Sequence, residues 1–158
     1  MTGFYRKKKC SKNRRVFVGI TLKSKNFSAD MGYGGFGRFR NKVAVLSSDE
    51  FGEHYEELNK AMFLFGEERD TFYQKHDAKT VRLIEANAIT AEIANFCYQA
   101  DCEGSIDQRQ AKQIYEKIKD YDDDVCYGYA GRSDCAMFSD LKTIFKDCAE
   151  NGKKIIWR

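Results

Sequence analysis

The chain contains no proline in its 158 residues. Proline lacks a backbone N–H and disrupts helix interiors, so its absence favours a helix-rich protein with few rigid turns. Long apolar runs are also missing, and without a stretch of about 18 apolar residues we expect no transmembrane helix. The apolar run that follows the basic N-terminus, residues 16–22, is short. A secretory signal is therefore not expected either.

Residue types that bind metals or catalyse reactions are scarce. The chain has two histidines, His54 and His76, and none of its six cysteines forms a Cys-x-x-Cys pair. Structural zinc sites usually need four such ligands at short spacings, so we expect no metal site. Ser–His and Cys–His pairings lack a local motif that would mark a nucleophile and its base. We expect no cofactor and a protein that is not an enzyme.

The cysteines lie at positions 10, 97, 102, 126, 135 and 148. Because no export signal is expected, the sequence predicts reduced thiols in a cytoplasmic protein. Cys97 and Cys148 fall on apolar faces of expected helices, and we predict that both are core residues.

Charge is distributed unevenly along the chain. Hydrophobic residues make up 42% and charged residues 32%, which is typical of one soluble globular domain. Residues 1–45 are strongly basic and hold a single acid, Asp30, whereas residues 46–158 are net acidic. We predict a flexible basic arm over 1–15 and one domain over 16–158. The arm could bind nucleic acid non-specifically, solubilise the terminus or dock on an acidic protein, through Lys7, Lys8, Lys9, Lys12, Arg14 and Arg15.

Apolar periodicity predicts a single, mostly helical α+β domain of about five helices with a small sheet. Residues 16–22 are rich in β-branched and aromatic residues and form a strand that pairs with residues 154–157. Residues 26–35 form a glycine-rich loop, and a helix begins near Phe36. Ser47 and Glu50 have the spacing of a capping box that opens the next helix.

The second half of the chain reads as further helices. The sequence predicts a short helix over residues 67–77 and the longest helix over residues 79–100. Residues 101–104 form a turn, and residues 105–108 cap another helix. The last helix ends at residues 151–152, an Asn-Gly pair that is typical of a left-handed helix end.

Glycines in residues 32–37 follow the pattern Gly-x-Gly-x-x-Gly. Glycines let the backbone approach a phosphate, and the N-terminus of the following helix offers unpaired amides. The strand context of a Rossmann motif is missing, because no strand ends directly before the glycines. The segment is either a flexible turn or a phosphate-contacting loop. In the second case its ligand-binding residues are Tyr33, Gly34, Gly35, Arg38 and Arg40.

Residues 127–134 form a second candidate segment, with two tyrosines, two glycines, an arginine and an aspartate. Tyrosine faces stack on bases, and arginine binds phosphate in a bidentate fashion. The candidate ligand-binding residues are Tyr127, Tyr129, Arg132 and Asp134. The alternative is a tight turn with a local ion pair. The preceding acidic run, residues 120–124, departs from a calcium loop at the required glycine and glutamate positions.

Residues 35–40, 101–106 and 127–135 together resemble small, uncharacterised proteins of phages and mobile elements of Gram-positive gut bacteria. The resemblance spans most of residues 30–150. It implies an accessory role in the host-cell cytoplasm, where such proteins often sequester a host signal or block a host defence enzyme.

We therefore expect a non-catalytic accessory protein that binds a phosphorylated ligand, such as a nucleotide immune signal, through the two candidate segments. The alternatives are a protein-interaction inhibitor of a host defence nuclease, like an anti-CRISPR protein, and a nucleic-acid-binding accessory protein. A membrane partner is not expected. A homo-oligomer that shares a ligand between its subunits stays open.

Overall fold

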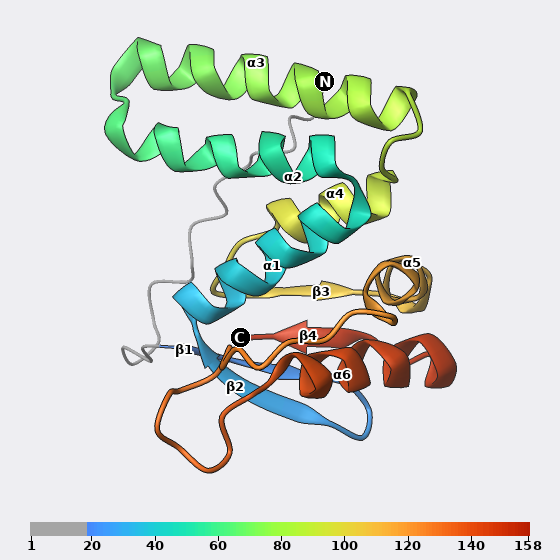
Figure 1. Ribbon diagram of the computed structural model, residues 1–158. Coiled ribbons are helices and arrows are strands. Elements are labelled where there is room, and N and C mark those ends of the chain that lie inside the picture. The colour runs from blue at the N-terminus through green and yellow to red at the C-terminus, as the bar shows by residue number, and fades with distance from the viewer. Residues whose placement is uncertain (1–18) are drawn as a thin grey trace.

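A computed structural model describes residues 19–158, which form one α+β domain (Figure 1). The strands are β1 (Gly19–Lys23), β2 (Ser28–Gly32), β3 (Gly104–Ile106) and β4 (Ile155–Trp157). The helices are α1 (Tyr33–Ser47), α2 (Asp49–Glu56), α3 (Gly66–Glu85), α4 (Ala91–Tyr98), α5 (Gln108–Ile118) and α6 (Phe138–Asn151), with a 3-10 helix, η1 (Glu57–Phe63), after α2. The predicted class, mostly helical with a small sheet, is confirmed. The basic arm lies outside the described residues.

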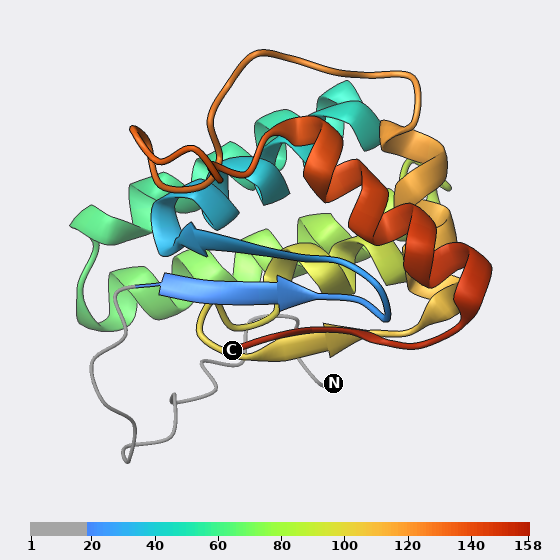
Figure 2. The ribbon, with the colours of Figure 1, turned by 90° about the horizontal axis from the view of Figure 1, so that it is seen from below.

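The four strands form one antiparallel sheet in the order β2-β1-β4-β3. Leu22 of β1 lies opposite Trp157 of β4, which confirms the predicted pairing of the first and last strands over their described part. Residues 16–18 lie outside the described range. Side chains alternate along β1, so Ile20 and Leu22 are buried. Helices α1 and α6 pack on this inner face, and Figure 2 looks onto the opposite face, which no described helix covers.

The core is built on an aromatic cluster that joins α1, α4, α6 and β4. The ring centroids of Phe36 and Trp157 are 5.4 Å apart, and those of Phe39 and Phe145 are 5.5 Å apart. Phe96 of α4 contacts Phe145 at 5.5 Å. Each ring is at most 1% exposed. Aromatic pairs of this kind contribute about 0.5–1.5 kcal/mol beyond the area they bury.

The predicted loop over residues 26–35 is wrong. Residues 28–32 form β2, because Ala29 and Met31 alternate inward beside Leu22 and Ile20 of β1. Helix α1 then begins at Tyr33, so most of the glycine run lies inside its first turns. Sequence periodicity missed this start because glycine is unfavourable in helix interiors. Close packing compensates for that cost at Gly35, where a Cβ atom would overlap the carbonyl oxygen of Tyr127.

Residues 67–77 are helical as predicted, but the predicted boundaries of this helix and of the helix over residues 79–100 are wrong. A single helix, α3, spans residues 66–85, and α4 begins only at Ala91. Asn87 lies between them with φ 57°. Asparagine tolerates this left-handed conformation better than most residues, and it ends α3. The Thr90 side chain then accepts a hydrogen bond from the Ile93 amide and caps α4.

One helix cap differs by a residue from the prediction, and two other helix ends agree with it. Ser48 rather than Ser47 caps α2, because its hydroxyl accepts the Phe51 amide, whereas the Ser47 hydroxyl donates to the Val43 carbonyl. Asp107 and Gln110 form a reciprocal capping box at α5, so the predicted cap within residues 105–108 is confirmed. Part of the predicted turn before it belongs to β3. The left-handed end of α6 is confirmed by Gly152, with φ 77°.

The prediction that all six cysteines are reduced is wrong. Cys126 and Cys135 form a disulfide with their Cα atoms 6.1 Å apart, and Cys102 is disulfide-bonded as well. Sequence spacing could not show this, because the pairing depends on how residues 126–137 fold back on themselves beside α1. Cys97 and Cys148 are free and buried, as predicted for core residues. The expectation of a cytoplasmic protein thereby loses one of its supports.

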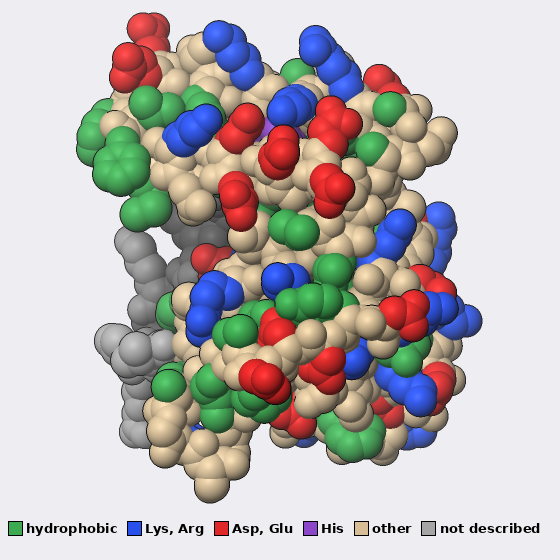
Figure 3. Space-filling model, in the orientation of Figure 1, with side chains coloured by type: hydrophobic (Ala, Val, Ile, Leu, Met, Phe, Trp, Pro, Cys, Tyr) green, Lys and Arg blue, Asp and Glu red, His purple; other side chains and the backbone are tan. Residues whose placement is uncertain are grey.

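Surface charge and apolar side chains gather around α2 and η1. Asp49, Glu50, Glu53 and Glu56 form a row of carboxylates along α2, and Figure 3 shows several acidic side chains in that region. Beside this row, the end of η1 and the following turn expose Met62, Phe63 and Phe65, each about three-quarters accessible. None of the helices within residues 19–158 has the length and apolar character needed to cross a bilayer.

Candidate phosphate-binding pocket at the start of helix α1

The two candidate segments lie side by side. Gly35 packs against the Tyr127 carbonyl, and the Arg38 guanidinium donates a hydrogen bond to the Cys126 carbonyl at 2.9 Å. The ring of Tyr129 lies against Gly32, the residue that precedes α1. Residues 127–129 therefore lie beside the start of α1 in space, although about ninety residues of chain separate the two segments.

The side chains that the sequence singled out differ widely in accessibility. Tyr33, Gly34, Arg38, Arg132 and Asp134 are exposed, and Tyr129 is partly buried. Gly35, Arg40 and Tyr127 are buried.

Tyr127 is part of the core rather than a stacking platform. Its ring is 2% exposed and packs edge-on against Phe39, with centroids 6.2 Å apart. Its hydroxyl donates to Asp123 at 2.8 Å. Burial, together with this hydrogen bond and the charge of Asp123, raises the pKa of Tyr127. The same carboxylate accepts the Tyr121 hydroxyl, so the acidic run helps to order residues 121–127.

Arg132 and Asp134 form a local ion pair, the alternative left open by the sequence. The guanidinium donates from Nε to Oδ1 at 2.7 Å and from Nη2 to Oδ2 at 2.5 Å. The hydrogen bonds from Arg132 lower the pKa of Asp134. Arg132 also lies over the Tyr129 ring at 5.5 Å. With both charges compensated in the free protein, a ligand phosphate would have to displace Asp134.

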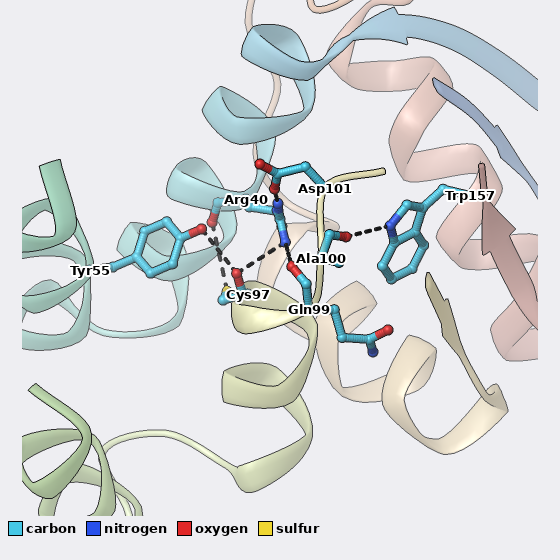
Figure 4. Close-up of polar contacts among 7 residues, drawn as sticks. All are labelled: Arg40, Tyr55, Cys97, Gln99, Ala100, Asp101 and Trp157. Atoms are coloured by element: carbon cyan, nitrogen blue, oxygen red, sulfur yellow. Dashed lines mark hydrogen bonds and ion pairs between the residues drawn. The ribbon is translucent and has the colours of Figure 1, made fainter. Parts of the chain in front are cut away.

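Arg40 lines a neighbouring pocket, and Figure 4 shows its polar contacts. It is 3% exposed, and its Nη1 donates to the Cys97 carbonyl at 3.2 Å and to the Gln99 carbonyl at 2.6 Å. Nη2 forms an ion pair with Asp101. Arginine near a helix C-terminus satisfies the carbonyls that the helix leaves unpaired. Arg40 therefore holds the end of α4, and these contacts occupy most of its donors.

Two further side chains hydrogen-bond to carbonyls at the end of α4 and just after it. The Tyr55 hydroxyl donates to the Cys97 carbonyl at 3.0 Å, and the Trp157 indole donates to the Ala100 carbonyl at 3.0 Å. Burial raises the pKa of the Cys97 thiol to about 12, so it stays protonated at neutral pH. Residues from α1, α2 and β4 thus contact this part of the chain.

The pocket itself has a volume of about 850 Å³, within the range of small-molecule sites. Its walls come from the first two turns of α1, the end of α2 with η1, and the segment after α4. It is lined by Tyr33, Gly34, Gly37, Arg38, Arg40, Asn41, Tyr55, Glu56, Leu58, Asn59, Met62, Cys97, Tyr98, Gln99, Ala100, Asp101 and Cys102. Five of the predicted ligand-binding positions lie in or beside α1, and four of these line the pocket: Tyr33, Gly34, Arg38 and Arg40.

The α1 wall favours an anion. Gly32 is the N-cap of α1 and provides no side-chain cap, and the first turn contains no acidic residue. The first amides of a helix have no partner within it and carry partial positive charge. A Cβ atom at Gly34 or Gly37 would meet no described atom within 4 Å, so the backbone there is open. Arg38 adds a full positive charge one turn into the helix.

The opposite wall carries polar groups and two carboxylates. Asp101 is paired with Arg40, and Glu56 accepts a hydrogen bond from the Asn41 side chain at 3.1 Å. Sequence reasoning missed Asn41 and Glu56. The sequence feature that could have revealed them is the short link at Ser48 between α1 and α2, because it turns the second helix back along the first.

The fold and this pocket define a class, an α+β protein with an anion-compatible pocket at a helix N-terminus. Comparison with known proteins found no match for the chain, whether among protein-family models, curated proteins or solved structures.

Proposed function

We propose that the protein is a non-catalytic binding protein for a phosphorylated small molecule of the nucleotide class. One observation carries the proposal: a pocket of about 850 Å³ borders the uncapped, acid-free and glycine-rich first turns of α1. This combination lets backbone amides approach a phosphate while the helix dipole and Arg38 stabilise its charge.

The pocket suggests how such a ligand would lie. Phosphate oxygens would accept hydrogen bonds from the first α1 amides and from Arg38. Hydroxyl or amino groups would donate to Glu56, whose carboxylate lies on the opposite wall. Tyr33 and Met62 offer apolar surface for a ring. The protonated Cys97 thiol supports a binding role rather than a nucleophilic one.

The sequence resemblance suggests a purpose for this binding. A small accessory protein that holds a nucleotide immune signal would lower the free concentration of that signal and so weaken a host defence response. We propose this role as a consequence of ligand binding in the pocket. The proposed binding site does not depend on the role.

Calorimetric titration with linear and cyclic nucleotides tests the pocket. We expect saturable binding that Arg38→Gln weakens roughly tenfold, because charge-assisted hydrogen bonds to a phosphate contribute about 1.5–3 kcal/mol. Arg82→Gln is the matched control, since Arg82 is exposed on α3 and does not line the pocket. Equal affinity of both variants for a nucleotide that binds would overturn the site assignment.

Gly37→Ala separates ligand binding from stability. The added methyl group meets no described atom, so it should stabilise α1 by about 0.5–1 kcal/mol while narrowing the pocket. We expect a higher melting temperature together with weaker nucleotide binding. A variant that gains stability and keeps full affinity would place the ligand elsewhere.

The alternative function, inhibition of a host defence nuclease by direct contact, is favoured by a separate surface. The acidic row over α2 adjoins the exposed side chains Met62, Phe63 and Phe65 (Figure 3). Acidic surfaces beside apolar patches fit a protein that normally binds nucleic acid. Under this alternative, Phe63→Asp abolishes inhibition of a guided nuclease, whereas Arg38→Gln leaves it intact.

A further inference from the structure

The outer face of the sheet carries a cluster of positive charge. Alternation along β1 and β4 points Lys23 and Ile156 to this face, opposite each other in the register. The Thr21 amide donates to the Arg158 carbonyl at 3.0 Å, which places Arg158 beside Thr21 in the next register position. Lys23 and Arg158 are therefore diagonal neighbours, roughly 7–8 Å apart in a sheet of this kind.

More cations gather at the end of the same face. Asp147 of α6 accepts hydrogen bonds from the Ser24 hydroxyl at 2.6 Å and the Asn26 amide at 2.9 Å. These bonds fasten the β1–β2 turn, which carries Lys25, to the last turn of α6. Lys153 and Lys154 follow that turn directly and lead into β4. We call Lys23, Lys25, Lys153, Lys154 and Arg158 the basic sheet face.

All five cations are exposed, and none forms an ion pair with a residue in the range 19–158. Asp30 is the single carboxylate among the outward-facing positions of the four strands. Its Oδ1 already accepts the Thr21 hydroxyl at 2.6 Å. Clustered like charges repel one another, so the binding of an anionic partner would relieve this repulsion.

One exposed apolar side chain accompanies the charges. Ile156 is 39% exposed opposite Lys23. A positively charged surface that tracks the phosphate backbone is the electrostatic element of single-stranded nucleic-acid binding. A membrane-binding surface would instead need a broad apolar face to enter the lipid.

We propose that the basic sheet face binds single-stranded nucleic acid through its phosphate backbone. This site is separate from the α1 pocket, because none of its residues lines that pocket. The proposal does not depend on the nucleotide-binding function, and either can fail alone.

Fluorescence anisotropy with a labelled oligothymidylate tests the proposal on the full chain. Lys23→Glu/Arg158→Glu should weaken binding roughly tenfold or more and reduce the salt slope of log K by about 1.4, since each phosphate contact to a single strand contributes about 0.7. The matched control is Lys112→Glu/Lys117→Glu, which reverses two exposed cations on α5 and changes the net charge equally. Circular dichroism checks that each variant is folded.

Each result either supports or overturns the assignment. A selective loss in the sheet variant supports it. An equal loss in both double variants, or no binding by the unmodified protein, overturns it. Two other polyanions serve as comparisons: vesicles of equal parts phosphatidylcholine and phosphatidylserine, and poly-L-glutamate. The assignment is also overturned if either binds as tightly as the oligonucleotide and loses binding in the same variant.

Discussion

Helices α3 and α6 are held to the protein in different ways. Helix α6 has 14 residues and buries Phe138, Leu141, Ile144, Phe145, Asp147, Cys148 and Ala149. Helix α3 is longer, with 20 residues, but buries only His76, Thr80 and Leu83. Most helical stability in proteins comes from packing of an apolar face rather than from length. The longest helix of this domain is therefore expected to be its least stable.

The contacts of α3 are also unusually polar. The rings of His54 and His76 are stacked, with centroids 3.8 Å apart and both buried. His76 Nε2 donates to the His54 carbonyl at 2.9 Å, and His54 Nε2 lies 2.9 Å from the Thr80 hydroxyl. The Tyr98 hydroxyl joins Thr80 at 3.2 Å. We call these four residues the histidine cluster, which links α2, α3 and α4.

The largest expected difference between the two helices comes from removing a ring. Phe145→Ala of α6 should cost about 3–5 kcal/mol, because Phe145 is fully buried and contacts Phe39 and Phe96. Phe72→Ala of α3 should cost about 1 kcal/mol, since Phe72 is only partly buried. Urea unfolding measures both changes. Equal costs would contradict the claim that α3 is weakly packed.

The second prediction is a loss of stability in acid that begins at α3. Burial lowers the pKa of His76 from 6.5 to about 4, and burial together with Lys79 lowers the pKa of His54. The folded state therefore keeps both rings neutral, whereas the unfolded state takes up protons below about pH 6.5. Stability is complete above that pH and falls toward pH 4, by on the order of 3 kcal/mol for His76.

Hydrogen exchange followed by mass spectrometry at several pH values locates this effect. Amides of α2 and α3 should lose protection as the pH falls from 6.5 to 4, while those of α6 keep theirs. Glu57 and Lys79 lie near the His54 ring with opposite charges, and Asp77 and Tyr98 face His76. His76→Gln should flatten the pH dependence. An unchanged profile in that variant would assign the acid sensitivity to other groups.

The smallest predicted difference concerns one glycine at each helix. Gly152 ends α6 with φ 77°, and Gly66 begins α3 with φ 54°. Alanine in a left-handed conformation costs about 1–2 kcal/mol. We expect Gly152→Ala to lower global stability by about 1 kcal/mol. Gly66→Ala should mainly release α3 and leave the global transition almost unchanged, which calorimetry can resolve.

The sequence alone predicted those parts of the fold that depend on local pattern. The pairing of β1 with β4, a helix cap within residues 105–108 and the helix end at residues 151–152 all follow from side-chain alternation or from special backbone residues. The break at Asn87 was missed, because apolar periodicity continues through it and asparagine is a weaker signal than glycine or proline.

For the candidate site, composition identified the right segments but not the role of each side chain. Arg38 and Gly34 stay accessible beside the pocket, whereas Arg40 and Tyr127 are used inside the protein. All four occur in similar local sequence, rich in glycine and aromatic residues. Which arginine faces solvent depends on where α4 ends, and Arg40 contacts that end across 57 to 59 residues of chain.

The chain's residues by themselves determined a proline-free, helix-rich α+β domain, with a glycine-rich segment beside arginines. These features follow from propensity and periodicity, which act over a few residues. Only the tertiary structure decided that Cys126 pairs with Cys135, that His54 stacks on His76, and that α1, η1 and the end of α4 enclose a pocket. Each of these depends on segments brought together by burial of the aromatic core, and burial is not encoded at any single position.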